Sequence, residues 1–274
     1  MMQRSRTGLL TLLPALALAL ACGGGTEEGG PSDEAAETAA PAVHPDSAAT
    51  ITGTVSFEGT APAPETIDMS EEPTCADKHA GGATQPVAVV TDGMLGNVYV
   101  YVKDGLGDRA FPTPSEGVEI DQDGCLYTPR VLAIQTGQPL IIKNSDGILH
   151  NIHTSPTANP SFNVSQPVEM ETEKEFSTAE VMIPVKCDVH GWMEAYIGVQ
   201  EHPYAAVTAT DGTFTLANLP PGTYTLEAWH EAYGTQTATV TVGAKETGTA
   251  SFTFTAAAAG AHVPLGEPLV LHTR

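Results

Sequence analysis

Three side chains that can bind a soft metal ion lie within seven consecutive residues. Cys187, His190 and Met193 form the pattern Cys-x-x-His-x-x-Met, which offers a thiolate, an imidazole and a thioether. A second imidazole is available upstream, from His150 or His153. Two imidazoles, one thiolate and a weak axial thioether are the ligands of trigonal copper sites that transfer electrons. The residue types therefore predict one such copper site.

The sequence around the motif predicts the strands that would hold it. Apolar runs at 181–185 and 195–199 flank the motif and are typical of buried strands. A short loop between antiparallel strands brings its ends close together. We therefore expect Cys187 to end one strand, His190 to lie at the loop tip and Met193 to begin the next strand.

The second imidazole would come from the end of a neighbouring strand. Residues 144–147 (Asn-Ser-Asp-Gly) predict a turn, and residues 148–152 are apolar enough to form a strand after it. Residues three apart on a strand face opposite sides, so only one of His150 and His153 can point inward. We choose His150, with Asn151 bracing the loop from behind the ligands.

Other interpretations of these residues stay open at this point. A cysteine with two histidines could hold zinc, which prefers tetrahedral sites of nitrogen and sulfur. Cys187 could also be a structural thiol or half of a disulfide, and the histidines could be ordinary polar residues of loops.

The combined motifs resemble the cupredoxins, the blue copper proteins of the amicyanin and plastocyanin type. The upstream stretch Leu-His-Asn-Ile-His, which ends at His153, is similar to that family's His-Asn-Val-His, and residues 137–144 resemble its preceding strand. The resemblance covers residues 118–200 and implies a Greek-key β-sandwich with one type 1 copper site. The ligands that it implies are His150, Cys187 and His190, with Met193 as the axial ligand.

Two positions depart from the cupredoxin pattern. Lys186 stands where the family often has an aromatic or apolar residue, and Gly191-Trp192 replaces a loop that contains proline. These differences concern the redox potential and the partner surface more than the identity of the metal.

A second resemblance covers residues 201–256. Asp-Gly-x-Phe-x-Leu, Leu-Pro-Pro-Gly-x-Tyr and Leu-Glu-Ala-Trp in this range resemble the carboxypeptidase regulatory-like domain, a transthyretin-like β-sandwich. That family implies a structural or binding module without catalysis. Residues 51–55 and 97–102 resemble its early strands, so we expect 51–117 to begin this sandwich and the copper domain to be inserted. Alternatively, these early strands extend the copper sandwich.

No stretch of the sequence has a sustained 3.6-residue periodicity, and Asp-Gly turns recur along it. We therefore predict an all-β protein with two sandwiches.

The N-terminus has the pattern of an export signal. Within residues 1–21, two arginines precede an apolar run that is too short to span a membrane. The sequence Ala-Leu-Ala-Cys at its end resembles a bacterial lipoprotein signal, cleaved before Cys22, whose thiol then carries lipid; ordinary secretion is the alternative. Residues 22–50 read as a disordered tether and residues 257–274 as a tail. We expect a lipid-anchored protein of the bacterial cell envelope, periplasmic or at the cell surface.

The cysteine count agrees with a free thiol at the motif. The chain has four cysteines, and three remain when Cys22 is set aside for lipid. An odd number indicates one unpaired thiol. Pairing Cys75 with Cys125 leaves Cys187 free, so we predict that disulfide, which an oxidising compartment permits.

The charge restricts the partners. Asp and Glu number 33 against 11 Lys and Arg, for a net charge of −22. Because nucleic acid is bound by basic surfaces, we do not expect it as a partner. The acidic surface would steer a cationic redox protein such as a basic cytochrome, or would serve solubility alone.

We therefore expect a membrane-tethered type 1 copper protein that carries single electrons, with His190 as the electron exit because its ring edge would reach solvent. The chain has one copper motif and none of the common hydrolase or phosphate-binding motifs, so we do not expect an enzyme. The alternative is a non-redox envelope protein that binds carbohydrate or protein with its two sandwiches.

Overall fold

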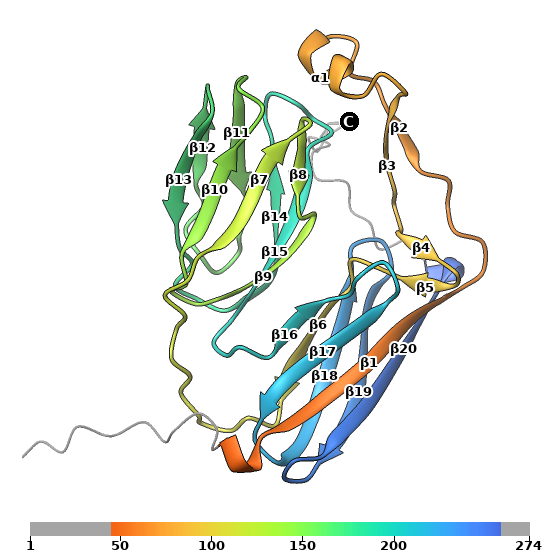
Figure 1. Cartoon of the computed structure of the whole chain (residues 1–274), viewed down its shortest axis with the longest axis vertical. Helices are drawn as coiled ribbons and strands as arrows, with labels where there is room; N and C mark the ends of the chain where they lie inside the picture. The colour runs from red at the N-terminus through yellow and green to blue at the C-terminus, as the bar shows by residue number, and fades with distance from the viewer. Residues whose placement is uncertain (1–44, 259–274) are drawn as a thin grey trace, which may run out of the picture. The chain divides into compact units, whose positions relative to one another are not determined.

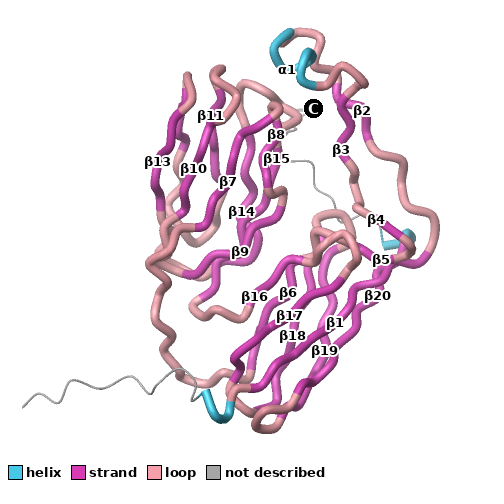
Figure 2. Tube along the Cα trace, viewed as in Figure 1, coloured by secondary structure: helices cyan, strands magenta, loops and turns pink. Residues whose placement is uncertain are grey.

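The computed structural model describes residues 45–258, and most of them lie in strands (Figure 1). Figure 2 shows how little helix this range contains: a single α-helix, α1 (Pro73–Lys78), and the 3-10 turns Pro45–Ser47 and Ala256–Ala258. The all-β prediction is confirmed. The predicted signal peptide, the predicted lipidation site Cys22, and most of the predicted tether and tail lie outside the described residues. Between residues 45 and 258, no helix is both long and apolar enough to cross a membrane.

Residues 118–200 form the first sandwich, which has two sheets around one core. Its strand orders are β13-β10-β7-β8 and β12-β11-β14-β15-β9. Strand β15 is buried at six of its seven positions, whereas β10 alternates between buried and half-buried side chains. The strands are β7 (Val118–Asp123), β8 (Leu126–Thr128), β9 (Val131–Gln135), β10 (Leu140–Asn144), β11 (His150–Thr154), β12 (Asn163–Gln166), β13 (Met170–Lys174), β14 (Glu180–Lys186) and β15 (Glu194–Gln200).

The second sandwich is built from both ends of the described chain. One sheet has the order β17-β1-β5-β4, with β20 also paired to β1, and the other has the order β16-β6-β18-β19. Its strands are β1 (Ala49–Glu58), β4 (Val90–Thr91), β5 (Met94–Leu95), β6 (Tyr99–Asp104), β16 (Ala205–Val207), β17 (Thr213–Leu219), β18 (Gly222–His230), β19 (Gly234–Val242) and β20 (Thr247–Thr255).

The chain leaves the second sandwich after β6 and returns to it at β16. These two strands are antiparallel neighbours, with Ala205 opposite Tyr101. Strand β20 alternates between exposed and buried side chains along most of its length, as expected for a strand with one face on a core. The residues of the first sandwich therefore lie, in sequence, between two paired strands of the second.

One part of the predicted range 51–117 does not belong to the second sandwich, and that prediction needs correction. Residues 65–85, called the anchored segment below, contain β2 (Glu65–Ile67), α1 and β3 (Ala83–Gln85). Among the described strands, β2 pairs only with β3. Met69, Cys75 and Ala83 from this segment are buried in the core of the first sandwich. The reason is that its few apolar side chains find their contacts there, where a disulfide also holds it.

The two sandwiches share a small apolar contact. Tyr99 and Tyr101 of β6 pack with Val131 and Tyr196 of the first sandwich. A Cβ at position 198 would lie 2.4 Å from the Tyr99 ring, so glycine at this position of β15 lets the ring approach the strand.

Candidate metal centre

The loop between β14 and β15 holds the Cys-x-x-His-x-x-Met motif. Lys186 pairs with Glu194 across the two strands, which leaves residues 187–193 as the connection. The Cys187 N–H donates to the Met193 carbonyl at 3.1 Å, and the Met193 N–H donates to the His190 carbonyl at 2.9 Å. The His190 N–H lies 3.4 Å from the Cys187 Sγ, which it can stabilise as a thiolate. The backbone of the loop therefore curves around the Cys187 sulfur.

His150 meets this loop because β11 pairs with β14. His153 is opposite Lys186, which places the start of β11 beside the motif. The Nδ1 atoms of His150 and His190 are 2.9 Å apart, and the His190 Nδ1 is 3.9 Å from the Cys187 Sγ. One donor atom from each of these three buried residues lies within 4.8 Å of the others. Two imidazole nitrogens and one thiol sulfur thus converge on one buried point.

Met193 is the fourth predicted ligand. It is completely buried, directly precedes β15 and belongs to the same core cluster as Cys187. A buried thioether has no strong hydrogen-bonding partner to satisfy, so it remains free to act as a weak ligand.

Asn151 braces the loop. Its Oδ1 accepts hydrogen bonds from the Asp188 N–H at 2.8 Å and from the Cys187 thiol at 3.3 Å. Its Nδ2 donates to Asn163 Oδ1 at 2.6 Å. His153 points away from the cluster and lies 3.0 Å from the Asp188 carboxylate. The structure therefore places His150 inward and His153 outward.

The structure adds Asp146 to the surroundings of the ligands; in the sequence this residue is only part of the predicted turn at 144–147. Asp146 is buried, and its Oδ2 accepts from His150 Nε2 at 2.8 Å and from the Cys125 N–H at 2.7 Å. Its Oδ1 accepts from Lys78 Nζ at 2.5 Å and from the Gly124 N–H at 2.7 Å. The one available signal was its spacing, four residues before a predicted ligand.

These contacts shift the pKa values of the cluster. Burial alone would raise the pKa of Cys187, but hydrogen bonds from His150 and from backbone N–H groups outweigh burial and lower it. Burial would likewise raise the pKa of Asp146, yet its bonds with His150 and Lys78 hold that pKa below its ordinary value. Burial, and then the charge of His150, lower the pKa of His190. The thiolate and a neutral His190, which are the forms that bind metal, are both favoured.

The expectation that the His190 ring edge reaches solvent is wrong. His190 is only 3% exposed. The Trp192 ring lies against it, with 5.2 Å between ring centroids, and the Trp192 Nε1 donates to the Cys125 carbonyl at 3.0 Å. Long-range packing of Trp192 against the β7–β8 turn thus covers the imidazole, and a loop tip alone does not ensure exposure.

Cys75 and Cys125 form a disulfide that attaches α1 to the β7–β8 turn. Cys187 is the free cysteine among the described residues. His79 Nε2 lies 2.7 Å from the Gly124 carbonyl, so a further contact holds the anchored segment at the same end of the first sandwich as the ligand loop.

The donor atoms fit copper better than zinc. A structural zinc site would need a fourth strong protein ligand, and the carboxylate that contacts His150 is that of Asp146. Both oxygens of Asp146 are already occupied by four hydrogen-bond donors. A second group of candidate ligands, Cys125 with Asp146 and His150, is excluded because the Cys125 sulfur is in the disulfide. Two nitrogens, one thiolate and a buried thioether remain, which is the donor set of a type 1 copper site.

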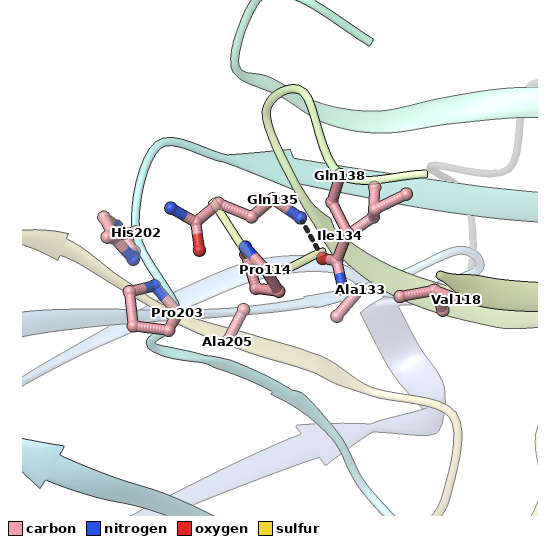
Figure 3. Close-up of a pocket in the computed structure, with 9 residues that line it drawn as sticks. All are labelled: Pro114, Val118, Ala133, Ile134, Gln135, Gln138, His202, Pro203 and Ala205. Atoms are coloured by element: carbon pink, nitrogen blue, oxygen red, sulfur yellow. Dashed lines mark hydrogen bonds between the residues drawn. The ribbon is translucent and has the colours of Figure 1, made fainter. Parts of the chain in front are cut away.

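A cavity of about 200 Å³ lies between β9 and β16, and Figure 3 shows the residues that line it. His202 and Gln135 line it with apolar residues such as Ile134, and the Gln135 N–H donates to Gln138 Oε1 at 3.0 Å. None of the predicted ligands lines this cavity.

Residues 194–255 match the family model of the carboxypeptidase regulatory-like domain. This range contains β16 to β20 of the second sandwich and supports the resemblance read from residues 201–256. No curated protein matches the chain.

Several solved structures are similar to part of the chain. A copper-containing nitrite reductase from Thermus scotoductus is 20% identical, with a TM-score of 0.30, over 35% of this chain and 24% of that protein. A purple cupredoxin from Nitrosopumilus maritimus is 20% identical, with a TM-score of 0.27, over 30% of this chain and 99% of that protein. A Cu(I) form of an amicyanin mutant is 14% identical, with a TM-score of 0.28, over 37% of this chain and 98% of that protein.

Proposed function

We propose that the protein is a one-electron carrier with a single type 1 copper site in the first sandwich. The observation that carries this proposal is the convergence of His150 Nδ1, His190 Nδ1 and Cys187 Sγ within 4.8 Å of one another, all buried. Bound copper would supply a centre that alternates between Cu(II) and Cu(I). Cys187, His150 and His190 would hold the ion, and the buried Met193 thioether would add a weak fourth ligand.

The protein's own residues restrict what can happen at this point. All four ligands are at most 3% exposed, so water is kept from the site. Asn151 and the backbone hydrogen bonds of the loop hold the Cys187 sulfur, and Asp146 and Trp192 hold the imidazoles of His150 and His190. A fixed ligand set rearranges little when the charge of the ion changes, which favours electron transfer over substrate chemistry. We therefore propose a carrier and not an enzyme.

A titration with Cu(II) tests this function. The metal-free protein should develop an intense visible thiolate-to-copper absorption that saturates at one copper per chain. Zinc should compete with copper without producing colour. A colourless protein that binds zinc more tightly than copper would contradict the proposal, and the non-redox binding protein would then become the better interpretation.

The proposed partner is a cationic redox protein such as a basic cytochrome. The chain carries a net charge of −22, which attracts such a protein over long distances. Two exposed apolar side chains adjoin ligands in the sequence: Leu149, 45% exposed, and Val189, 49% exposed. They would make the short-lived contact while the surrounding carboxylates guide the encounter.

Stopped-flow reduction by a basic cytochrome tests the partner. The rate should fall as salt is raised, because exposed charges are screened over roughly 8–10 Å at physiological ionic strength. Val189→Ser should lower the rate at every salt concentration, since it removes contact and not charge. Val181→Ser is the matched control, because Val181 is similarly exposed at the other end of β14. A reduction rate that does not change with salt concentration would contradict electrostatic steering and would indicate that the acidic surface serves solubility alone.

We also propose that the protein is exported and held at the cell envelope by lipid on Cys22. The disulfide between Cys75 and Cys125 supports this location, because disulfides persist in oxidising compartments. Cys22→Ala should move the protein from the membrane fraction to the soluble fraction.

A further inference from the structure

Asp146 supplies a buried carboxylate directly beside the ligand cluster. It is buried, and four donors surround it: two backbone N–H groups from the β7–β8 turn, the Lys78 ammonium and the His150 imidazole. A buried charge is tolerated only when it is paired and hydrogen-bonded in this way. Asp146 is not one of the four proposed ligands. We therefore ask how its buried negative charge affects the ligand that it contacts, His150.

The contact between Asp146 and His150 determines which ring nitrogen faces the cluster. A carboxylate only accepts hydrogen bonds, so His150 Nε2 carries the proton that it donates to Asp146 Oδ2 at 2.8 Å. In the neutral ring, Nδ1 then presents its lone pair toward His190 and Cys187. A carboxylate behind a metal-binding imidazole also makes the ring a stronger donor, which favours the more highly charged state of the metal.

Lys78 opposes this effect from the other oxygen. Its Nζ is 2.5 Å from Asp146 Oδ1, and the side chain comes from α1 of the anchored segment. The disulfide attaches α1 to the β7–β8 turn, whose Gly124 and Cys125 N–H groups bind the same carboxylate. The position of the lysine is therefore set by the same turn that holds the aspartate. The positive charge of Lys78 partly neutralises the Asp146 carboxylate, which weakens its electrostatic effect on His150.

We propose that Asp146 is a positioning residue that orients His150 and lowers the reduction potential of the metal site, and that Lys78 partly offsets it. This inference rests on the proposed copper function. It predicts that removal of the two charges shifts the site in opposite directions, because one charge is negative and the other is positive.

Asp146→Asn is the first test, with Cu(II) as the only metal added. The substitution keeps the size of the side chain and one acceptor oxygen but removes the charge. At a fixed applied potential, the ratio of Cu(I) to Cu(II) should rise about tenfold, which for one electron corresponds to about 59 mV. The affinity for Cu(II) should fall by about 10- to 100-fold, as is usual when a partner behind a metal ligand is lost.

Lys78→Met is the second test, and it leaves the aspartate in place. The ratio of Cu(I) to Cu(II) should fall about threefold, a smaller effect because the Lys78 side chain is 34% exposed and water screens its charge. Lys103→Met is the matched control. Lys103 also pairs with a largely buried carboxylate, that of Glu227, but in the second sandwich, and its removal should leave the ratio unchanged.

Opposite shifts in the two variants, with no shift in the control, would support the inference. Blue variants whose potentials equal that of the unsubstituted protein would overturn it while leaving the copper function intact. Shifts of the same sign would also overturn it, because they indicate general loosening of the site. If Asp146→Asn does not fold, the sign of the Lys78→Met shift decides. A wild-type protein that gives no colour with Cu(II) would instead remove the copper function itself.

Discussion

Both sandwiches bury histidine, and the surroundings of these histidines differ. In the second sandwich, His230 accepts a hydrogen bond from the Ala232 N–H at 3.1 Å and stacks on Tyr233. Burial, followed by the charge of Arg130, lowers the pKa of His230 to about 4. In the first sandwich, His150 lies between a carboxylate and a thiol, and these partners outweigh burial and raise its pKa. Burial alone therefore does not mark a functional histidine, whereas convergence with other donors and a counter-charge does.

The largest expected contrast between the sandwiches is in the visible spectrum. Cys187→Ser should abolish the thiolate-to-copper absorption completely, because the cysteine sulfur produces it. His230→Phe should leave the absorption unchanged. The spectrum of each purified variant after addition of Cu(II) checks both outcomes. A colour that survives in Cys187→Ser would show that the absorption comes from another site.

A second contrast concerns the disulfide, which belongs to the first sandwich alone among the described residues. Replacing Cys75 and Cys125 together by alanine should cost about 4 kcal/mol of unfolding free energy, since the bond closes a loop with a sequence separation of 50. Metal-free protein should be unfolded in urea and followed by tryptophan fluorescence.

The two tryptophans of the chain separate the sandwiches in that experiment. Trp192 belongs to the first sandwich, and Trp229 belongs to β18 of the second, where its ring also packs on Tyr196 of the first. The Trp229→Phe and Trp192→Phe backgrounds separate the two signals. The Trp192 transition should shift further than the Trp229 transition. Equal shifts would mean that the two sandwiches unfold as one unit.

The buried His230 should make the second sandwich sensitive to acid. Well above pH 6.5 the ring is neutral in both the folded and the unfolded state, so its protonation does not affect stability there. Between pH 6.5 and about 4, the unfolded state takes up a proton that the folded state does not, and stability falls as the pH falls. The loss should reach about 3 kcal/mol near pH 4.

His230→Phe should remove this part of the pH dependence. The measurement is the unfolding free energy from urea titrations at several pH values, read from Trp229. A slope in this pH window that is the same in wild type and variant would contradict the assignment of a neutral, buried His230.

The smallest expected contrast uses two buried polar side chains, one in each sandwich, whose hydrogen bonds hold the groups around them. Asn151 binds Asp188 and Cys187 in the first sandwich, and Thr208 binds the Val98 N–H and the Leu95 carbonyl in the second. Asn151→Leu and Thr208→Val should each cost about 1–3 kcal/mol, because buried partners lose their hydrogen bonds. Only Asn151→Leu should change the absorption spectrum of the copper-loaded protein. A spectral change in Thr208→Val would show that the second sandwich also affects the metal site.

Local sequence was enough to predict the strands and much of the cluster. The apolar runs beside Cys187 and Met193 form β14 and β15, and the alternation of strand faces predicted that only one of His150 and His153 points inward. These features depend on neighbours within a few residues, where periodicity is informative. Metal binding itself stays a prediction.

The remaining features depend on contacts between residues far apart in sequence. Asp146 lies in a stretch that reads as an ordinary turn, and its role appears only when Lys78, 68 residues away, is beside it. The burial of His190 depends on Trp192 reaching Cys125, across 67 residues. The anchored segment has turn-like composition, and nothing in its pattern indicates which core will take its few apolar side chains. Such contacts are set by packing of the whole fold, and local pattern does not encode them.

The parallel pairing of β1 with β20 has a consequence for the order of folding. The Ser56 and Thr253 hydroxyls meet across 197 positions of the chain, and the whole first sandwich lies between them. Contacts so distant in sequence form slowly, because a long loop must close before they are made. We therefore expect the core of the first sandwich to form before β1 pairs with β20. The proposed metal pocket would then exist before the protein has finished folding, and copper could bind a chain whose second sandwich is still open.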